Sequence, residues 1–215
     1  MEKIRADGAG FVVAGLIEVI NANRAHLSEI DGAIGDGDHG INMSKGFTAA
    51  GARLAGAPAG LARALAVLGE TLVNDVGGSM GPLYGTFFGS MSEALGEREF
   101  LDSATFSAML GAGQAAIQEI GAAKVGDKTL LDALVPARTA FDGALAAGQP
   151  FAECLRRMAA AAEEGKESTR GMVAKVGRAS RLGERSRGVL DAGATSCALM
   201  LQSMAQTIGK ALASG

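Results

Sequence analysis

Apolar side chains along this chain recur at the three- and four-residue steps that place them on one face of an α-helix. The clearest runs are Val12, Leu16 and Ile20, followed by Leu61, Leu65, Leu68 and Leu72. Alanine, leucine and glycine are abundant, and the alternation of β-branched or aromatic residues that is typical of strands is missing. Because alanine and leucine favour helices, the sequence predicts an all-α protein.

Eight helices are expected in a single domain over residues 1–215, a length that suffices for one large core. The expected ranges are 8–28, 41–54, 59–75, 81–95, 103–121, 128–147, 150–169 and 193–212. Pro58 and Pro150 lie near helix starts, where a missing N–H costs little. Pro136 should kink or split the sixth helix. The many small residues favour closely packed antiparallel helices in one bundle.

The overall composition excludes several classes of protein. The formal net charge is −3, aromatic residues make up 4% and tryptophan is absent, so nothing indicates a nucleic-acid partner. The charged N-terminus has no apolar signal segment, and the longest uncharged stretch, 192–209, is too polar to span a membrane. Cys154 and Cys197 lie in apolar contexts and are expected to be buried free thiols in a reducing compartment. A cytoplasmic protein is expected.

The most distinctive segment is the glycine-rich stretch 31–40, which holds Asp31, Asp36 and Asp38 directly before an expected helix. Loop glycines allow carboxylates to converge, and converging carboxylates repel one another unless a cation lies between them. Asp oxygens suit Mg²⁺, which commonly shares its remaining positions with substrate phosphates. The segment therefore predicts a metal site that holds a nucleotide, and an ordinary surface turn of Asp and Gly is the alternative.

Three other kinds of loop fit this segment poorly. Residues 35–40 match the G-x-G-x-x-G pattern of dinucleotide-binding loops, but no β-branched strand precedes them and two carboxylates would face the pyrophosphate. No Gly-Lys-Ser/Thr follows, as a P-loop requires. An EF-hand counted from Asp36 would need a glutamate at the position of Phe47.

Two further glycine-rich segments precede expected helices. Residues 76–85 end on a helix start, where free N–H groups and the helix dipole attract an anion. A helix–helix turn followed by close packing at Gly85 and Gly89 explains that segment equally well. Residues 126–129 are also compatible with a simple N-cap.

The stretch 177–188 is expected to be a long, irregular and mobile loop. It contains one acidic residue, Glu184, and four arginines: Arg178, Arg181, Arg185 and Arg187. Guanidinium groups suit phosphate oxygens, and a solvated basic loop or an RNA-binding patch are the alternatives. RNA ranks lower because no aromatic residue is interleaved. Metal ligands, helix starts and an arginine-bearing lid are together what phosphoryl transfer needs.

Together these motifs resemble one known family. The matching segments are 34–40, Asn42-Met43, 76–78, 81–83, 126–129, 177–180 and 182–186, in the family's order and spacing over nearly the whole chain. They are similar to the dihydroxyacetone kinase L subunit, DhaL, the nucleotide-binding half of dihydroxyacetone kinases. Fatty-acid-kinase nucleotide domains usually carry Thr at the position of His39 and fit less well. The resemblance implies a capsule of about eight antiparallel helices with the nucleotide at one end.

The resemblance also implies roles for individual residues. Asp31, Asp36 and Asp38 would ligate two Mg²⁺ ions that bridge the phosphates of ADP or ATP, and Arg178 would be the catalytic residue. The nucleotide would be lined by His39, Gly40, Ile41, Asn42, Ser79, Met80, Gly121, Leu130, Arg178, Asp191, Ala192 and Gly193. For His39, a hydrogen bond that orients the loop is an equally good explanation.

The expected partner is a separate K subunit, which binds the hydroxyketone covalently through a histidine; no such domain is expected in this sequence. A phosphocarrier of the phosphotransferase system that rephosphorylates bound ADP is a second expected partner, with free ATP as the alternative donor. A homodimer is compatible with the sequence. Erythrulose is the alternative substrate, and a nucleotide-binding regulator of a transcription factor is the alternative class of protein.

The chain departs from the family's usual pattern at four positions. The family commonly has Ser at Met80, Pro at Ala192, Tyr at Arg181 and an apolar residue at Arg187. The change at Met80 removes a polar nucleotide contact, and a lost proline loosens the turn at Asp191. The added positive charge is expected to alter docking to the partner.

Overall fold

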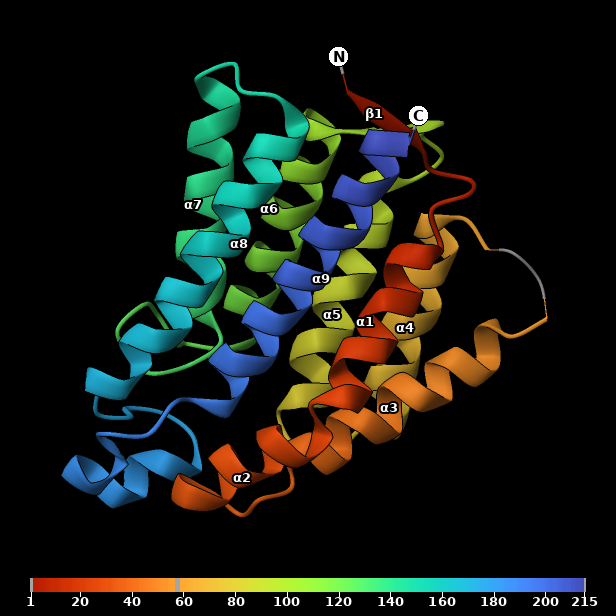
Figure 1. The fold of residues 1–215 in the computed structure, drawn as a ribbon. Helices are drawn as coiled ribbons and strands as arrows, with labels where there is room; N and C mark the ends of the chain where they lie inside the picture. The colour runs from red at the N-terminus through yellow and green to blue at the C-terminus, as the bar shows by residue number, and fades with distance from the viewer. Residues whose placement is uncertain (1, 57–58, 215) are drawn as a thin grey trace.

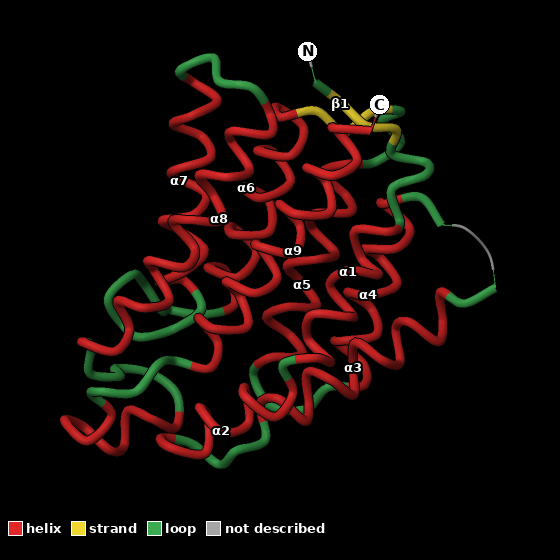
Figure 2. Tube along the Cα trace, in the orientation of Figure 1, coloured by secondary structure: helices red, strands yellow, loops and turns green. Residues whose placement is uncertain are grey.

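The computed structural model describes residues 2–56 and 59–214, and most of the chain is helical over this range. Figures 1 and 2 show a bundle of long helices with very little strand. The α-helices are α1 (Phe11–Ala22), α2 (Arg24–Ile34), α3 (His39–Leu54), α4 (Leu61–Asp75), α5 (Met80–Leu95), α6 (Ser103–Ile120), α7 (Leu131–Ala146), α8 (Phe151–Ser168) and α9 (Ala192–Ser214). Two 3₁₀ segments, η1 (Thr169–Gly171) and η2 (Arg178–Ser186), lie between α8 and α9. The all-α prediction is confirmed, and the predicted boundary at Pro58 lies outside the described residues.

The first predicted helix, 8–28, is wrong, because the structure has two helices there. Asn23 separates them: its side-chain amide and its backbone N–H both donate to the carbonyl of Val19, at 2.8 and 3.2 Å. Its φ of −101° and ψ of 10° depart from helical values, so α1 stops and α2 begins in a new direction. α2 then continues past Asp31 to Ile34, so the predicted loop begins with helix.

Pro136 lies inside α7 without splitting it. Proline has no N–H to donate to the carbonyl of Asp132, four residues earlier. The carbonyl oxygen of Asp132 lies against Gly165 of α8. A Cβ at residue 165 would clash with this oxygen, and glycine has none. The predicted split of the sixth helix is wrong, since α7 is continuous, and Gly165 lets α8 approach α7 closely.

The helical prediction also missed an antiparallel pair of three-residue strands. β1 (Lys3–Arg5) pairs with β2 (Phe100–Asp102), with Ile4 opposite Leu101. Both of these side chains are buried against the helical core, and the Lys3 ammonium lies 3.6 Å from the centroid of the Phe100 ring. Strands this short cannot be recognised from an alternating pattern.

The helices enclose one large apolar cluster. α4 and α5 approach each other closely because Gly69 faces the backbone of Gly85 and Gly89, as the close-packing alternative expected. Cys154 and Cys197 are buried and free, as predicted. Within the described part of the chain, no helix combines the length and apolar character that a membrane span requires.

The connections between helices decide where a site can form. In Figure 1 the two chain termini lie at one end of the bundle, and the α2–α3, α4–α5, α6–α7 and α8–α9 connections lie toward the other. η2 packs against α2 at that end. The glycine-rich segments that the sequence singled out therefore gather in one place.

Candidate functional site

A cavity of about 380 Å³ lies at the loop end of the bundle and is lined by residues of all four connections. It brings together thirteen of the residues predicted to bind metal or nucleotide. These are Asp31, Asp36, Asp38, His39, Asn42, Ser79, Met80, Gly121, Leu130, Arg178, Asp191, Ala192 and Gly193. The predicted residues are thus neighbours in space although they span most of the sequence.

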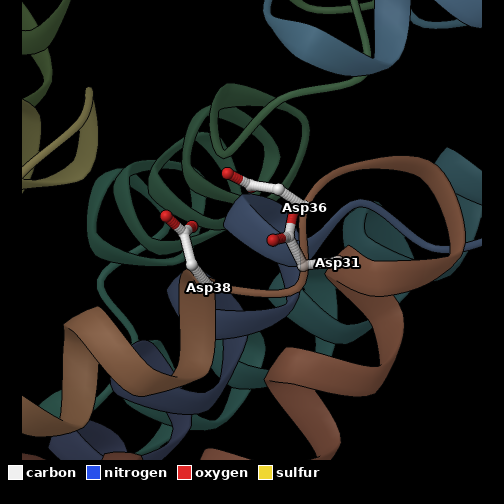
Figure 3. A group of neighbouring side chains, drawn as sticks. All are labelled: Asp31, Asp36 and Asp38. Carbon is white, nitrogen blue, oxygen red and sulfur yellow. The ribbon is translucent and has the colours of Figure 1, made fainter.

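Three carboxylates form one cluster at the cavity. Asp31 comes from the last turn of α2, and Asp36 and Asp38 come from the connection to α3 (Figure 3). One oxygen of each carboxylate lies within 4.8 Å of the others. Three hard anionic donors this close match the preference of Mg²⁺ for oxygen ligands. Asp36 and Asp38 are exposed and Asp31 is partly exposed, so substrate oxygens have room to complete the coordination of an ion.

The guanidinium of Arg178 reaches the same cluster from the start of η2 and donates to the carboxylate of Asp36. An ion pair this open to water contributes little to stability. Its importance lies in its place, because it puts a fork of N–H donors beside the acidic cluster at the cavity wall. Phosphate oxygens are good acceptors for such a fork.

Gly40 and Ile41 were predicted to contact the nucleotide, but the structure places them outside the cavity lining. Gly40 is buried where α3 meets α2, and a Cβ at this position would meet the carbonyl oxygen of Arg24 and the backbone and hydroxyl of Ser28. The side chain of Ile41 is 48% exposed. Gly40 therefore sets the distance between the two helices that flank the acidic cluster.

His39 is buried and connects three elements of the site. Its Nε2 lies 3.0 Å from Oγ of Ser196 in α9, and that hydroxyl lies 2.8 Å from the hydroxyl of Tyr84 in α5. Tyr84 also donates to the carbonyl of Gly193 at 3.0 Å. Burial lowers the pKa of His39 to about 4, although the Asp31 carboxylate opposes this shift. A neutral His39 held by Ser196 favours the loop-orienting explanation of this residue.

The start of α5 forms another part of the wall. Gly78 precedes it with a φ of 73°, a conformation that favours glycine. Ser79 is the residue before the helix, and its side chain makes no capping hydrogen bond to the described helix start. Ser79 and Met80 both line the cavity, so the positive end of the α5 dipole lies next to it. This arrangement suits an anionic group of a ligand.

Asp191 forms a further part of the wall, at the start of α9. Its Oδ2 accepts the N–H of Ala194 at 2.7 Å, which fixes the carboxylate as an N-cap. Burial raises the pKa of Asp191 to about 7, while the Ala194 hydrogen bond and the nearby Lys128 ammonium lower it. A Cβ at Gly193 would come within 3.0 Å of this carboxylate and 3.5 Å of the backbone nitrogen of Leu130. Gly193 thus lets α9 approach the start of α7.

The segment 177–188 has more regular secondary structure than the sequence predicted, and its predicted mobility without nucleotide stays a prediction. η2 consists of 3₁₀ turns on either side of Gly183, whose φ is 55°. Arg187 donates to the carboxylate of Glu184 at 3.0 Å and to the carbonyl of Gly171. These contacts tie the end of η2 to η1, so Arg187 has a structural role within the segment. Its predicted role in docking a partner stays a prediction.

Several residues that line the cavity have no role predicted from the sequence. Leu83, Ile117 and Val176 form apolar parts of its wall. Leu83 belongs to the segment 81–83 that carries the family resemblance, whereas nothing in the sequence distinguishes Ile117 and Val176 from ordinary core residues. Lys128 also lines it. This lysine belongs to the motif 126–129, which could have drawn attention to it, but its burial is visible only in the structure.

Comparison with known proteins identifies the family of this chain. The model of the DAK2 domain matches residues 33–206. The ADP-binding subunit DhaL of PEP-dependent dihydroxyacetone kinase 1 from Listeria innocua is 38% identical over 88% of this chain and 90% of its own length. The corresponding DhaL subunit from Escherichia coli is 36% identical over 87% of this chain and 90% of its own length. The chain belongs to the DAK2 domain family. The resemblance to DhaL subunits inferred from the motifs is confirmed.

Other DAK2 relatives are longer. L-erythrulose kinase from Pectobacterium atrosepticum is 32% identical over 89% of this chain but only 33% of its own length. The crystal structure of the dihydroxyacetone kinase of C. freundii in complex with AMP-PNP and Mg²⁺ superposes with a TM-score of 0.66 at 26% identity. That similarity covers 92% of this chain and 33% of the kinase chain. The DAK2 fold therefore occurs both as a separate subunit and as one third of larger kinases.

Proposed function

We propose that this chain is the nucleotide-binding subunit of a kinase for dihydroxyacetone or a related hydroxyketone, and that it requires Mg²⁺. The observation that carries the proposal is the convergence of Asp31, Asp36 and Asp38 at a cavity that Arg178 and the start of α5 also reach. Phosphoryl transfer depends mostly on positioning and charge stabilisation, and these are the groups that provide both.

The cavity wall combines charged groups with apolar side chains, and this combination supports an orientation for the nucleotide. The carboxylates, Arg178 and the α5 start provide the donors and ion ligands for phosphates. Leu83, Ile117 and Leu130 provide apolar surface that suits the adenine ring. ADP or ATP would therefore lie with its phosphates at the acidic cluster and its base against α5, α6 and the start of α7.

The residues of this chain then have distinct tasks in transfer. Asp31, Asp36 and Asp38 would hold two Mg²⁺ ions, which supply positive charge that neutralises the phosphates. Arg178 donates to the oxygens of the migrating phosphoryl group, where negative charge builds up. The hydroxyl acceptor would come from a hydroxyketone held by a separate K subunit, in line with the terminal phosphate.

The phosphoryl donor separates two versions of this function. DhaL relatives carry names that specify PEP-dependent and PTS-dependent kinases, which supports permanently bound ADP that a phosphotransferase-system carrier rephosphorylates. Direct use of free ATP is the alternative. Erythrulose is the second candidate substrate, because erythrulose kinases are among the relatives.

The deciding experiment combines nucleotide analysis with turnover. The chain is purified, its bound nucleotide is released and identified, and product formation from dihydroxyacetone or erythrulose is followed with and without the K subunit of a DhaL relative. ADP that copurifies and turns over only with the phosphocarrier supports the first version, and rapid exchange with ATP supports the second.

Two results would contradict the proposal. Ketone phosphorylation by the rigorously purified chain alone would overturn the two-subunit reading. Tight binding to a DNA-binding protein with no turnover in any combination would instead favour a nucleotide-dependent regulator.

A further inference from the structure

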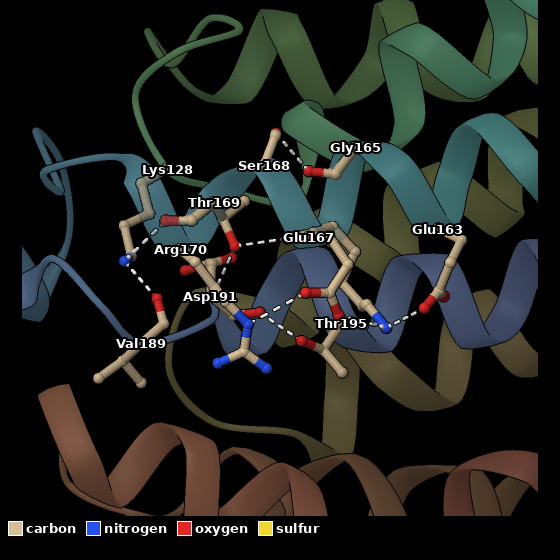
Figure 4. A network of polar contacts seen from close by, with 11 residues as sticks. Lys128, Glu163, Gly165, Glu167, Ser168, Thr169, Arg170, Val189, Asp191 and Thr195 are labelled. Atoms are coloured by element: carbon tan, nitrogen blue, oxygen red, sulfur yellow. Dashed lines mark hydrogen bonds and ion pairs between the residues drawn. The ribbon is translucent and has the colours of Figure 1, made fainter.

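Lys128 has an unusual environment for a charged side chain. It is 2% exposed, and its φ of 65° makes it the one non-glycine residue in the described chain with a left-handed backbone. Its ammonium donates to four carbonyl oxygens: those of Thr169 at 2.9 Å, Met172 at 3.3 Å, Ser186 at 2.6 Å and Val189 at 2.6 Å. Figure 4 shows two of these contacts, to Thr169 and Val189. An ammonium has three N–H groups, so these acceptors already use its full capacity.

The four carbonyls come from the two ends of one segment. Thr169 and Met172 lie where the chain leaves α8, and Ser186 and Val189 lie where it returns toward α9. Between them the chain forms η2, which carries Arg178. The ammonium of Lys128 therefore holds together the two ends of the segment from which Arg178 contacts the acidic cluster.

Two of the same residues also fix the neighbouring backbone. Oγ1 of Thr169 accepts the N–H of Asp191 at 3.0 Å, and Oγ of Ser186 accepts the N–H of Ala174 at 2.9 Å. The ammonium of Lys128 thus stabilises both the entry to η2 and the turn into α9. Burial lowers the pKa of Lys128, and the nearby Asp191 carboxylate opposes this shift.

The backbone around Lys128 is itself held by α7. The carboxylate of Asp132 accepts the N–H of Gly126 at 2.6 Å and the N–H of Thr129 at 2.7 Å. Lys128 lies between these two bonds, so its left-handed backbone is fixed from both sides. The ammonium is consequently presented to the 169–190 segment by a rigid part of the bundle.

We propose that Lys128 is a positioning residue whose buried ammonium holds the 169–190 segment in the form that presents Arg178 and Asp191 to the cavity. The role in transfer rests on the proposed function, but the role in ordering the segment does not. A direct contact between Lys128 and a nucleotide phosphate is the competing explanation. It is disfavoured because the N–H groups of this lysine are already bound to carbonyl oxygens.

The first test measures order in the nucleotide-free chain. Lys128→Met keeps the length of the side chain and the left-handed non-glycine backbone but removes the charge and its donors. Hydrogen exchange of residues 170–190 should accelerate by about tenfold or more, since several buried carbonyls lose their partner, while α1 and α5 keep their protection. Lys175→Met is the matched control, because Lys175 is an exposed lysine in the same region that pairs with Asp127. Unchanged exchange in Lys128→Met would overturn the proposal.

A second variant keeps the test decisive if Lys128→Met does not fold. Lys128→Gly suits the φ of 65° and leaves a space surrounded by carbonyl oxygens. Addition of n-butylammonium, which has the four carbons and the ammonium of the removed side chain, should restore folding or exchange protection, and the same concentration of sodium chloride should not. Failure of the ammonium to restore either one would contradict the proposed role.

The last arm distinguishes positioning from a general loss of structure. If Lys128 acts through Arg178, the rate of phosphoryl transfer in Lys128→Met should fall, and adding Arg178→Ala should lower it little further. Fully additive losses would overturn the link to Arg178. Normal exchange protection combined with lost Mg–ADP binding would instead show direct contact with the nucleotide. Should the wild-type chain bind no Mg–ADP, the proposed function fails, but the exchange result still decides whether Lys128 orders the segment.

Discussion

Gly40→Ala provides a quantitative test of how the fold holds the acidic cluster together. A Cβ at this position would meet the carbonyl oxygen of Arg24, and would lie 2.7 Å from Oγ and 2.8 Å from the backbone nitrogen of Ser28. Two of these three atoms belong to the backbone of α2, so they cannot rotate away. The added methyl group must therefore push α3 away from α2.

The magnitude follows from two opposing contributions. Overpacking of a close contact typically costs 1–3 kcal/mol, and this contact lies at the upper end because backbone atoms are involved. Replacing glycine by alanine in a helix returns about 1 kcal/mol at most. We expect the free energy of unfolding to fall by about 2 kcal/mol. Gly143→Ala in α7 is the matched control: a Cβ there meets nothing within 4 Å, so it should raise stability by roughly 0.5–1 kcal/mol.

The same change should damage the site. Asp31 lies on α2 and Asp38 directly precedes α3, so moving the helices apart separates two of the three carboxylates. Mg–ADP affinity should fall by roughly ten- to a hundredfold, as for residues that orient metal ligands. Urea unfolding and calorimetry of wild type, Gly40→Ala and Gly143→Ala measure both effects. Equal stability of the two variants together with unchanged Mg–ADP affinity for Gly40→Ala would refute this reasoning.

Three further predictions concern charge and burial. The pKa of Asp191 is raised to about 7 in the folded chain, against a value near 4 in the unfolded chain. The folded state therefore binds the proton more tightly, which stabilises it. This stabilisation is complete below about pH 4 and is lost as the pH rises to about 7. Urea unfolding of the nucleotide-free chain should show this loss of stability with rising pH. The loss should be at most about 4 kcal/mol, because water in the cavity screens the carboxylate. Asp191→Asn should remove this pH dependence. Burial raises the pKa of both thiols, that of Cys197 to about 12, so neither Cys154 nor Cys197 should react with Ellman's reagent at pH 8 until the chain unfolds; prompt labelling would contradict their burial. Arg178→Ala should slow phosphoryl transfer more than it weakens nucleotide binding, and equal losses in both would mean that it acts only in the ground state.

The sequence predicted the helical architecture from local patterns, whereas most of the nucleotide-lining residues were implied only by the resemblance to DhaL subunits. Helical periodicity identified the long helices, and the acidic residues on a glycine-rich segment predicted the cluster around Asp36. The break at Asn23 could not be predicted, since a single side-chain contact to Val19 ends the helix. The role of Gly40 was also hidden, because its close approach to α2 is a tertiary contact.

Lys128 illustrates a different limit. The motif that contains Lys128 was recognised, but its partners are backbone carbonyl groups at positions 169 to 189. Every residue has such a carbonyl, so the sequence does not show which residues accept these hydrogen bonds. The segment 177–188 was expected to be irregular because it is basic and rich in glycine. It is organised instead by contacts such as that of Arg187 with Gly171, which depend on how the chain returns to α9.

Calorimetric titration of the nucleotide-stripped chain with ADP, in the presence and absence of Mg²⁺, tests the central claim most directly. Wild type should bind ADP tightly with Mg²⁺ and weakly after chelation, and Asp36→Ala should lose the Mg²⁺-dependent part while keeping its helical circular dichroism. Glu18→Ala removes the same charge from an exposed position on α1, away from the cavity, and should bind as wild type does. Wild-type affinity for Mg–ADP in Asp36→Ala, or binding that is indifferent to Mg²⁺, would contradict the assignment of the acidic cluster as the metal site.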